Sequence, residues 1–263
     1  MARIALCQVN SGDEPEENLK LVRSGVEAAV AGGARIVVFP EATMARFGRP
    51  LEPVAEPLDG PWASAVAALA AEHDVLIVAG MFTPAAGRVR NTLLITGGGH
   101  HRGYDKIHLY DAFGFAESDT VAPGATLATF ELDGVVFGVA TCYDLRFPEL
   151  FRALADDGAD VVLLPASWGA GEGKREQWDV LVRARALDSG CWVLACGQAD
   201  PAATGVTVNP KAPTGIGYST VSDGFGRIAA QAGAGPEMLL VDVDPAVSAK
   251  ARTATGALAN RRL

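Results

Sequence analysis

The sequence lacks several features that mark common functional classes. No apolar run reaches the roughly 20 residues that a transmembrane helix needs. The N-terminal segment turns polar at Gln8, which is too early for a signal peptide. The four histidines form no HExxH motif or other spaced ligand set, and the four cysteines show no metal-ligand spacing. We therefore expect a cytoplasmic protein without a membrane anchor or a bound metal.

Basic residues are also scarce. The chain has 22 Lys and Arg against 31 Asp and Glu, which gives a formal net charge of −9. A nucleic acid needs a basic face to bind its phosphates, so this balance argues against nucleic-acid partners. It does not exclude an acidic small substrate, because one local Arg or Lys can outweigh a distant negative field.

Apolar residues and turn residues are plentiful. Hydrophobic residues make up 49% of the 263, with 30 Gly and 15 Pro, enough for a large core joined by tight turns. No repeat or composition break divides the chain, so we predict a single domain over residues 1–263. Strands alternate with helices in the first and middle parts, and antiparallel hairpins are mixed in. This pattern predicts an α/β fold with a mixed sheet, or two packed sheets, covered by helices.

One cysteine stands at a position that suits a nucleophile. An apolar, β-branched run starting at Val135 ends at Cys142, and Pro148 heads an apolar helix shortly after. The pattern predicts a strand-to-helix turn that lifts the thiol from the sheet beside free backbone N–H groups. Taken alone, Cys142 is better explained as a buried structural cysteine. We interpret the remaining cysteines as small buried hydrophobes: Cys7, Cys191 and Cys196.

Two charged residues gain meaning beside Cys142. Glu41 directly follows a short buried strand and Pro40, and Lys106 lies in an irregular polar segment over 105–126. Each alone fits a capping or solvated residue. A thiol, however, needs a base to become a nucleophile at neutral pH, and an oxyanion needs a fixed positive charge. We interpret His108 in the same segment as a hydrogen-bonded loop residue rather than a base.

Several segments, in order and spacing, resemble the nitrilase superfamily of carbon–nitrogen hydrolases, from residue 3 to about 243. They are Phe39-Pro-Glu41, Tyr104-Asp-Lys-Ile-His-Leu-Tyr-Asp111, Glu117-Ser-Asp119, Cys142-Tyr-Asp-Leu-Arg-Phe-Pro-Glu149 and Leu164-Pro-Ala-Ser-Trp168. Within the superfamily the chain is most similar to the Nit branch, which holds ω-amidases and deaminated glutathione amidases.

The resemblance implies a four-layer α-β-β-α sandwich, usually paired through helices into an eight-layer dimer or a larger homo-oligomer. It also implies a catalytic triad of Glu41, Lys106 and Cys142, assisted by Glu117, with no metal or organic cofactor. The family's C-terminal arm, here about 244–263, usually has a Pro before a pair of Arg. That Pro is missing before Arg261-Arg262, which leaves the arm's conformation open.

The chemistry that we expect is hydrolysis of a small amide through a thioester. Glu41 would accept the thiol proton of Cys142, and Lys106 with the backbone N–H of Tyr143 would stabilise the oxyanion. The same triad would serve an N-carbamoyl amino acid hydrolase and, with a poorer motif match, a nitrilase. A scaffold that binds a partner without catalysis is the non-enzyme alternative.

The residues that would bind the substrate are harder to assign. A substrate carboxylate would need a cation, and the candidates are Arg46 and either Lys174 or Arg175. The alternative for each is a solvated surface charge. Phe47 and Trp168 either form walls of the pocket or pack in the core. We interpret Arg146 as a structural residue that is ion-paired with Asp144 or Glu149.

Overall fold

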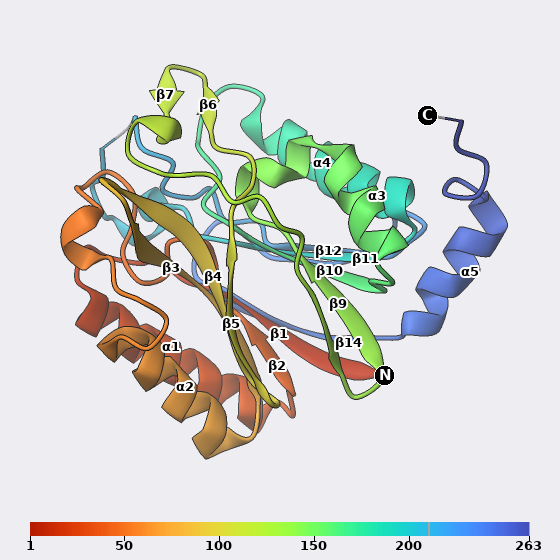
Figure 1. Cartoon of the computed structure of the whole chain (residues 1–263), viewed down its shortest axis with the longest axis horizontal. Coiled ribbons are helices and arrows are strands. Elements are labelled where there is room, and N and C mark those ends of the chain that lie inside the picture. Colours follow the sequence, from red (N-terminus) through yellow and green to blue (C-terminus); the bar gives the residue numbers. More distant parts are fainter. Residues whose placement is uncertain (210, 263) are drawn as a thin grey trace.

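Two six-stranded sheets packed face to face form the centre of the molecule (Figure 1). The computed structural model describes residues 1–209 and 211–262. The first sheet has the order β14-β1-β2-β3-β4-β5 and the second β13-β12-β11-β10-β9-β8. The strands of the first sheet are β1 (Ala2–Gln8), β2 (Ile36–Val38), β3 (Leu76–Ala85), β4 (Arg88–Gly97), β5 (His100–Asp105) and β14 (Glu237–Val243). Those of the second are β8 (Thr129–Leu132), β9 (Val135–Val139), β10 (Val161–Ala166), β11 (Trp192–Gly197), β12 (Thr220–Ser222) and β13 (Ile228–Gln231).

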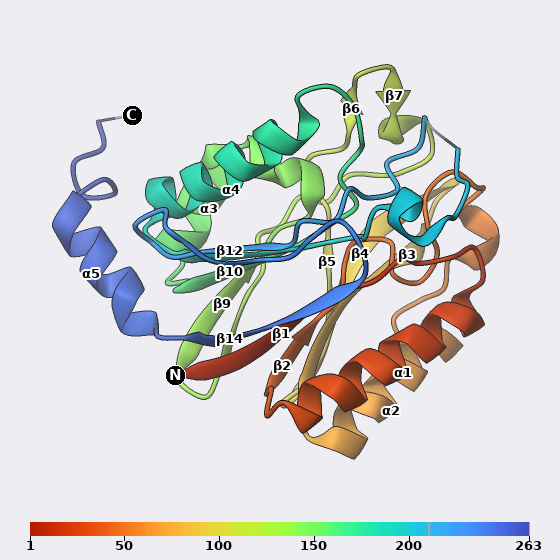
Figure 2. The same cartoon turned by 180° about the vertical axis from the view of Figure 1, so that it is seen from behind.

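Helices cover the outer face of each sheet. Helices α1 (Pro15–Ala31) and α2 (Pro61–His73) cover the first sheet, and α3 (Pro148–Asp156) and α4 (Lys174–Ser189) cover the second. The result is the predicted four-layer α-β-β-α sandwich, seen from opposite sides in Figures 1 and 2. None of the helices in the described residues is both long and apolar enough to cross a bilayer.

Alternation within the strands explains the layering. In β1, Ile4 and Leu6 join the core between the sheets, whereas Ala5 and Cys7 join the core beneath α1 and α2. Strand β10 divides its side chains between the central core and α3–α4 in the same way. Successive side chains in a strand point to opposite faces, and here both faces are buried. The sequences of these strands are therefore unbroken apolar runs. Because Leu6 is buried in the central core, truncating it to Ala would lower the free energy of unfolding by about 2–5 kcal/mol.

The parallel strands place the ends of several segments at one edge. Strands β1, β2 and β3 are parallel, as are β9, β10 and β11. Ligand sites in α/β sheets form beyond the carboxyl ends of such strands. Glu41 follows β2, Cys142 follows β9 and Ser167 follows β10, so these residues converge.

The 105–126 segment has more structure than we predicted. It contains a small hairpin of β6 (Asp111–Ala112) and β7 (Phe115–Ala116), followed by a single 3-10 turn, η2 (Glu117–Asp119). The two-residue turn has φ of 55° at Phe113 and 78° at Gly114. Glycine suits the second of these positions, as in tight hairpins generally. The pattern was not evident in the sequence because each strand has only two residues.

The C-terminal arm begins with helix α5 (Pro245–Thr255), which projects from the body (Figures 1 and 2). Its tail turns back, and Arg261 Nη1 lies 2.8 Å from Asp156 Oδ2 at the end of α3. The arm therefore closes on α3 even though it lacks the family's Pro. The remaining 3-10 turns are η1 (Glu52–Val54), η3 (Cys142–Arg146) and η4 (Pro201–Thr204).

Candidate active site

The four residues predicted to be catalytic meet at the carboxyl-end edge of the two sheets. Glu41 follows β2, Lys106 follows β5, Glu117 begins η2 and Cys142 begins η3. All four side chains are buried. They line one pocket.

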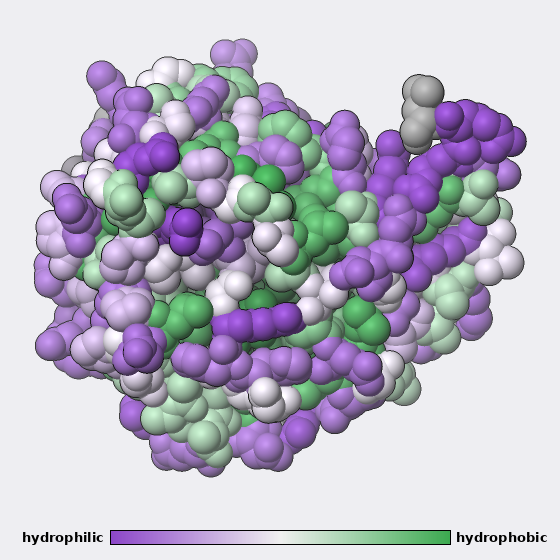
Figure 3. Space-filling view, viewed as in Figure 1, coloured by the Kyte–Doolittle hydropathy of each residue, from purple (hydrophilic) through white to green (hydrophobic). Residues whose placement is uncertain are grey.

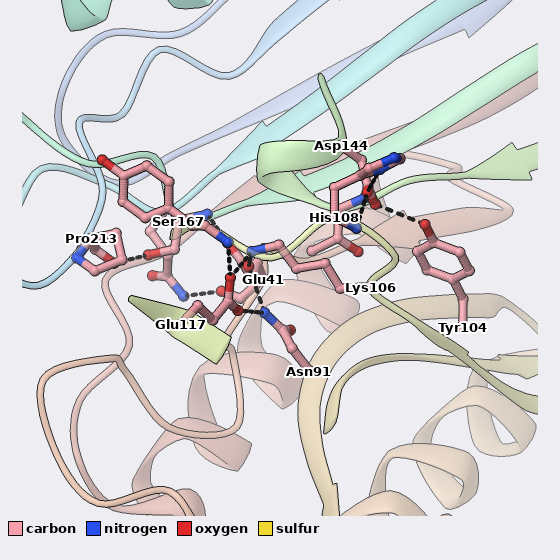
Figure 4. A network of polar contacts seen from close by, with 12 residues as sticks. Glu41, Asn91, Tyr104, Lys106, His108, Glu117, Asp144, Ser167 and Pro213 are labelled. Carbon is pink, nitrogen blue, oxygen red and sulfur yellow. Dashed lines mark hydrogen bonds and ion pairs between the residues drawn. The ribbon is translucent and has the colours of Figure 1, made fainter. Parts of the chain in front are cut away.

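An ion-pair network forms the floor of this pocket (Figure 4). Lys106 Nζ lies 2.9 Å from Glu41 Oε1 and 2.8 Å from Glu117 Oε2. Burial alone would lower the pKa of Lys106, but the charges of Glu117 and Glu41 outweigh it and raise this pKa well above its usual value. The floor therefore holds a permanent ammonium between two carboxylates.

Asn91 in β4 links the same two carboxylates, a role that the sequence analysis missed. Its Nδ2 donates to Glu41 Oε1 at 2.7 Å and to Glu117 Oε1 at 3.0 Å. Backbone N–H groups complete the set: Ser167 N donates to Glu41 Oε2 and Tyr110 N to Glu117 Oε2, both at 2.7 Å. All four carboxylate oxygens are thus held by charge-assisted hydrogen bonds. A buried amide inside a strand pattern is the only sequence signal that points to Asn91.

The turn at Cys142 has the predicted strand-to-helix geometry. Cys142 has φ of 46°, in the left-handed region, which costs a non-glycine residue about 1–3 kcal/mol. Burial and the charge of Glu41 raise the pKa of the Cys142 thiol well above its usual value, and Lys106 opposes them. The resting thiol is therefore protonated, and nucleophilic attack requires transfer of its proton to a base.

The other three cysteines are buried in the core clusters, as predicted. Burial raises the pKa of Cys7 to about 12 and also raises those of Cys191 and Cys196. Among the residues that the structure describes, none of these three cysteines lines the pocket that holds Cys142.

Two cations and a ring of aromatic groups form the mouth of the pocket. Arg146 Nη2 donates to Gln177 Oε1 at 2.6 Å, and its guanidinium lies 5.0 Å from the centre of the Trp168 ring. Lys174 Nζ donates to the Tyr110 hydroxyl at 3.0 Å. Within residues 1–209 and 211–262 neither cation pairs with a carboxylate. Burial, and then the charge of Arg146, lower the pKa of Lys174.

Some predicted binding residues do line this pocket. Phe47, Trp168 and Lys174 are among its walls, as are Tyr143 and Pro213. Phe47 and Trp168 are also packed against other aromatic rings, so each serves both as a wall and as a core residue.

The predictions for three arginines were wrong. Arg46 forms a two-point ion pair with Asp13, at 2.7 and 3.0 Å, away from the pocket. Arg175 pairs with Asp179 at 2.7 Å, one helical turn along α4, and lies over the Tyr218 ring. In both cases a neighbouring Asp holds the guanidinium. Arg146 lines the pocket and has no carboxylate partner among the residues described.

Asp144, a predicted partner of Arg146, faces elsewhere. Its carboxylate accepts hydrogen bonds from Tyr104, His108 and Thr141. His108 is a hydrogen-bonded loop residue, as predicted: its Nδ1 lies 2.7 Å from Asp144 Oδ1, and its ring stacks on Phe147 at 3.7 Å.

Comparisons with known proteins identify the family of the chain. Residues 3–253 match the carbon-nitrogen hydrolase family. Hydrolase Rv0480c of Mycobacterium tuberculosis is 50% identical, over 98% of this chain and 95% of that protein. A deaminated glutathione amidase of Escherichia coli is 32% identical, over 94% of this chain and 92% of that protein. The crystal structure of Saccharomyces cerevisiae Nit3, a member of branch 10 of the nitrilase superfamily, superposes with a TM-score of 0.85 at 27% identity, covering 100% of this chain and 97% of that one. These likenesses confirm the resemblance drawn from the motifs: the chain belongs to the carbon-nitrogen hydrolase family of the nitrilase superfamily and is a hydrolase of carbon–nitrogen amide bonds.

Proposed function

We propose that the protein hydrolyses an amide of a small carboxylic acid, as an ω-amidase or a deaminated glutathione amidase does. The products are a diacid and either ammonia, from a primary amide, or an amine, from a secondary amide such as that of deaminated glutathione. The observation that carries this proposal is the pair of partly buried cations, Arg146 and Lys174, beside a complete Glu-Lys-Cys set. A buried charge is costly unless it is paired. A carboxylate on the substrate would supply the missing partner, while the aromatic walls would contact its methylene groups.

The acylation step uses the floor of the pocket. Glu41 takes the thiol proton as the Cys142 sulfur attacks the amide carbonyl carbon. Lys106 and the Tyr143 backbone N–H stabilise the oxyanion, a contribution of about 2.7–4 kcal/mol for each donor. The tetrahedral intermediate then collapses to a thioester, and Glu41 delivers its proton to the departing nitrogen, so that ammonia leaves.

Deacylation reverses these roles. Glu41 takes a proton from a water molecule that attacks the thioester carbon, and the Cys142 sulfur leaves and recovers a proton from Glu41. Glu117 keeps Lys106 in place through their 2.8 Å contact. These steps use only side chains, backbone amides and water.

The Escherichia coli relative named deaminated glutathione amidase supports an acid-bearing amide as the substrate class. An N-carbamoyl amino acid is the second candidate, because Arg146 and Lys174 would hold its carboxylate equally well. Release of carbon dioxide together with ammonia identifies that reaction. A scaffold without activity is disfavoured by the presence of Glu41, Lys106 and Cys142 in mutual contact range of one pocket.

The test compares matched amides in an ammonia-release assay. Glutaramate and its methyl ester have the same reacting amide and differ in the distal charge. We expect kcat/KM for glutaramate to be at least about 100-fold higher, the effect of one or two charge-assisted hydrogen bonds. α-Ketoglutaramate and N-carbamoyl amino acids are ranked by the same ammonia release. Deaminated glutathione has no primary amide, so its hydrolysis is followed by the appearance of the cysteinylglycine amine. Equal rates for the acid and its ester contradict the proposal.

We further propose that two copies pair through the α3–α4 face and the C-terminal arm. On α4, Val180 is 64% exposed and Leu187 is 44% exposed. Hydrophobic residues also gather beside the projecting C-terminal helix (Figure 3). Light scattering should give twice the chain mass for the wild type and a monomer for Val180→Asp.

The free thiols of all four cysteines fit the reducing cytoplasm as the location.

A further inference from the structure

A second polar network lies on the other side of Lys106 from the ion pairs, and Asp144 is its centre (Figure 4). The Asp144 side chain is fully buried. Its Oδ2 accepts from the Tyr104 hydroxyl at 2.7 Å and from Thr141 N at 2.9 Å. Its Oδ1 accepts from His108 N at 2.9 Å and contacts His108 Nδ1 at 2.7 Å. A buried carboxylate with four partners is a rigid junction.

These partners belong to two segments from different sheets. Tyr104 and His108 stand two residues before and two residues after Lys106, at the end of β5 in the first sheet. Thr141 directly precedes Cys142, beyond the end of β9 in the second sheet. Asp144 therefore joins the segment that holds the ammonium to the turn that holds the sulfur.

Asp144 also closes the turn around Cys142. Its backbone N–H donates to Thr141 O at 2.9 Å, while its carboxylate receives Thr141 N. These reciprocal bonds enclose Cys142 and Tyr143, and Cys142 has a left-handed φ of 46°. Such a conformation persists only when the surrounding contacts enforce it.

From this geometry we infer that Asp144 is a positioning residue, which sets the location of the Cys142 sulfur relative to Lys106 and Glu41. It does not touch substrate and acts through the two segments that it joins. The effect of Asp144 on turnover rests on the proposed amide hydrolysis. Its effect on the reactivity of the Cys142 thiol does not depend on that proposal. Catalytic groups displaced by about 1 Å can lose a hundredfold in rate, so this junction should have a large effect.

The test is the Asp144→Asn variant, which keeps the shape of the side chain but offers one acceptor oxygen in place of two. Alkylation of Cys142 by iodoacetamide, followed by peptide mass spectrometry, reports the thiol without any amide substrate. We expect alkylation to be at least about tenfold slower, and kcat to fall at least about tenfold with KM within about twofold.

The direction of the change separates positioning from a simple charge effect. Removing a negative charge near a thiol lowers its pKa and would speed alkylation. Displacing the Cys142 thiol from Glu41 and Lys106 slows its alkylation. Faster or unchanged alkylation in a folded Asp144→Asn protein overturns the inference.

Asp223→Asn is the matched control. Asp223 Oδ1 likewise accepts two backbone N–H groups, from Phe225 at 2.9 Å and Arg227 at 3.0 Å, in the turn between β12 and β13. That turn does not border the pocket, so alkylation of Cys142 should keep its wild-type rate. A slowing equal to that of Asp144→Asn would assign the effect to general loosening of the fold and overturn the inference.

Tyr104→Phe decides the case if Asp144→Asn does not fold. It removes one donor to Asp144 and changes no charge, so it should slow alkylation by a smaller factor, about threefold or more. A wild-type rate in this variant then overturns the inference. If the wild-type enzyme hydrolyses none of the amides but alkylation slows in these variants, the proposed function fails and the positioning role stands.

Discussion

The floor and the mouth of the pocket hold their charges in opposite ways. On the floor, Lys106 lies between Glu41 and Glu117, and Asn91 links the two carboxylates. At the mouth, Arg146 and its neighbour Lys174 contact only neutral partners within the described chain. A saturated network is rigid and keeps its geometry through a reaction, whereas partly buried, unpaired cations favour an incoming anion. Under the proposed function, the floor breaks the amide bond and the mouth selects the substrate.

Removing the nucleophile at the floor of the pocket should have the largest effect on activity. Cys142→Ala should abolish ammonia release, a loss of at least about 10⁴-fold, because no thioester can form. Cys191→Ala is the control: this thiol is buried in the core behind α4, and its loss should leave kcat unchanged in the folded enzyme. Residual turnover near the wild-type rate in Cys142→Ala would contradict the triad.

A subtler change to the floor is Glu41→Gln, which keeps the size and shape of the side chain but cannot accept the thiol proton. The Cys142 pKa is raised above its usual value, so the thiol depends on that base. We expect kcat to fall about 10²–10⁴-fold with little change in KM. Steady-state ammonia release measures both constants. A rise in KM with unchanged kcat would contradict a role of Glu41 in proton transfer and indicate a role in substrate binding.

The mouth is tested by Arg146→Met, which keeps the aliphatic length and removes the charge. KM for glutaramate should rise about 10–100-fold, the equivalent of a charge-assisted hydrogen bond of about 1.5–3 kcal/mol. KM for the neutral methyl ester should stay the same. Arg46→Met is the matched control, because Arg46 is engaged by Asp13 outside the pocket. Equal effects on acid and ester would remove Arg146 from carboxylate recognition.

The floor was far easier to predict from sequence than the mouth. Glu41, Lys106, Glu117 and Cys142 each stand in a local motif whose order and spacing the family shares, so their meeting in one pocket could be predicted. Apolar runs and helices predicted only a mixed sheet or two packed sheets covered by helices, and the resemblance to the family implied the four layers. Asn91 could not be found this way, because its role depends on strand register across the sheet and no local motif marks it.

The three arginines were misassigned because a free guanidinium cannot be recognised without its neighbours, whereas Lys174 does line the pocket. Arg175 and Asp179 are four residues apart on one helix, a spacing that the sequence did offer as a warning. The Arg46–Asp13 pair joins residues 33 apart, which sequence spacing does not reveal. Arg146 was predicted to be ion-paired with Asp144 or Glu149 because it matches a residue common in the family's Cys motif. In the structure Asp144 instead turns toward Tyr104 and His108.

The smallest predicted effect is a pH dependence at the mouth. Burial and the charge of Arg146 lower the pKa of Lys174 from its usual 10.5. Lys174 is positive only below this lowered pKa, so KM for glutaramate should rise a few-fold as the pH increases through it. In Arg146→Met the neighbouring charge is gone, the pKa of Lys174 moves back up, and the rise in KM should shift to higher pH. Measuring KM against pH in both proteins, with Lys174→Met as the control that lacks the rise, checks the sign. If Lys174→Met keeps the same alkaline rise in KM, another group titrates there and the mouth selects its substrate through Arg146 alone.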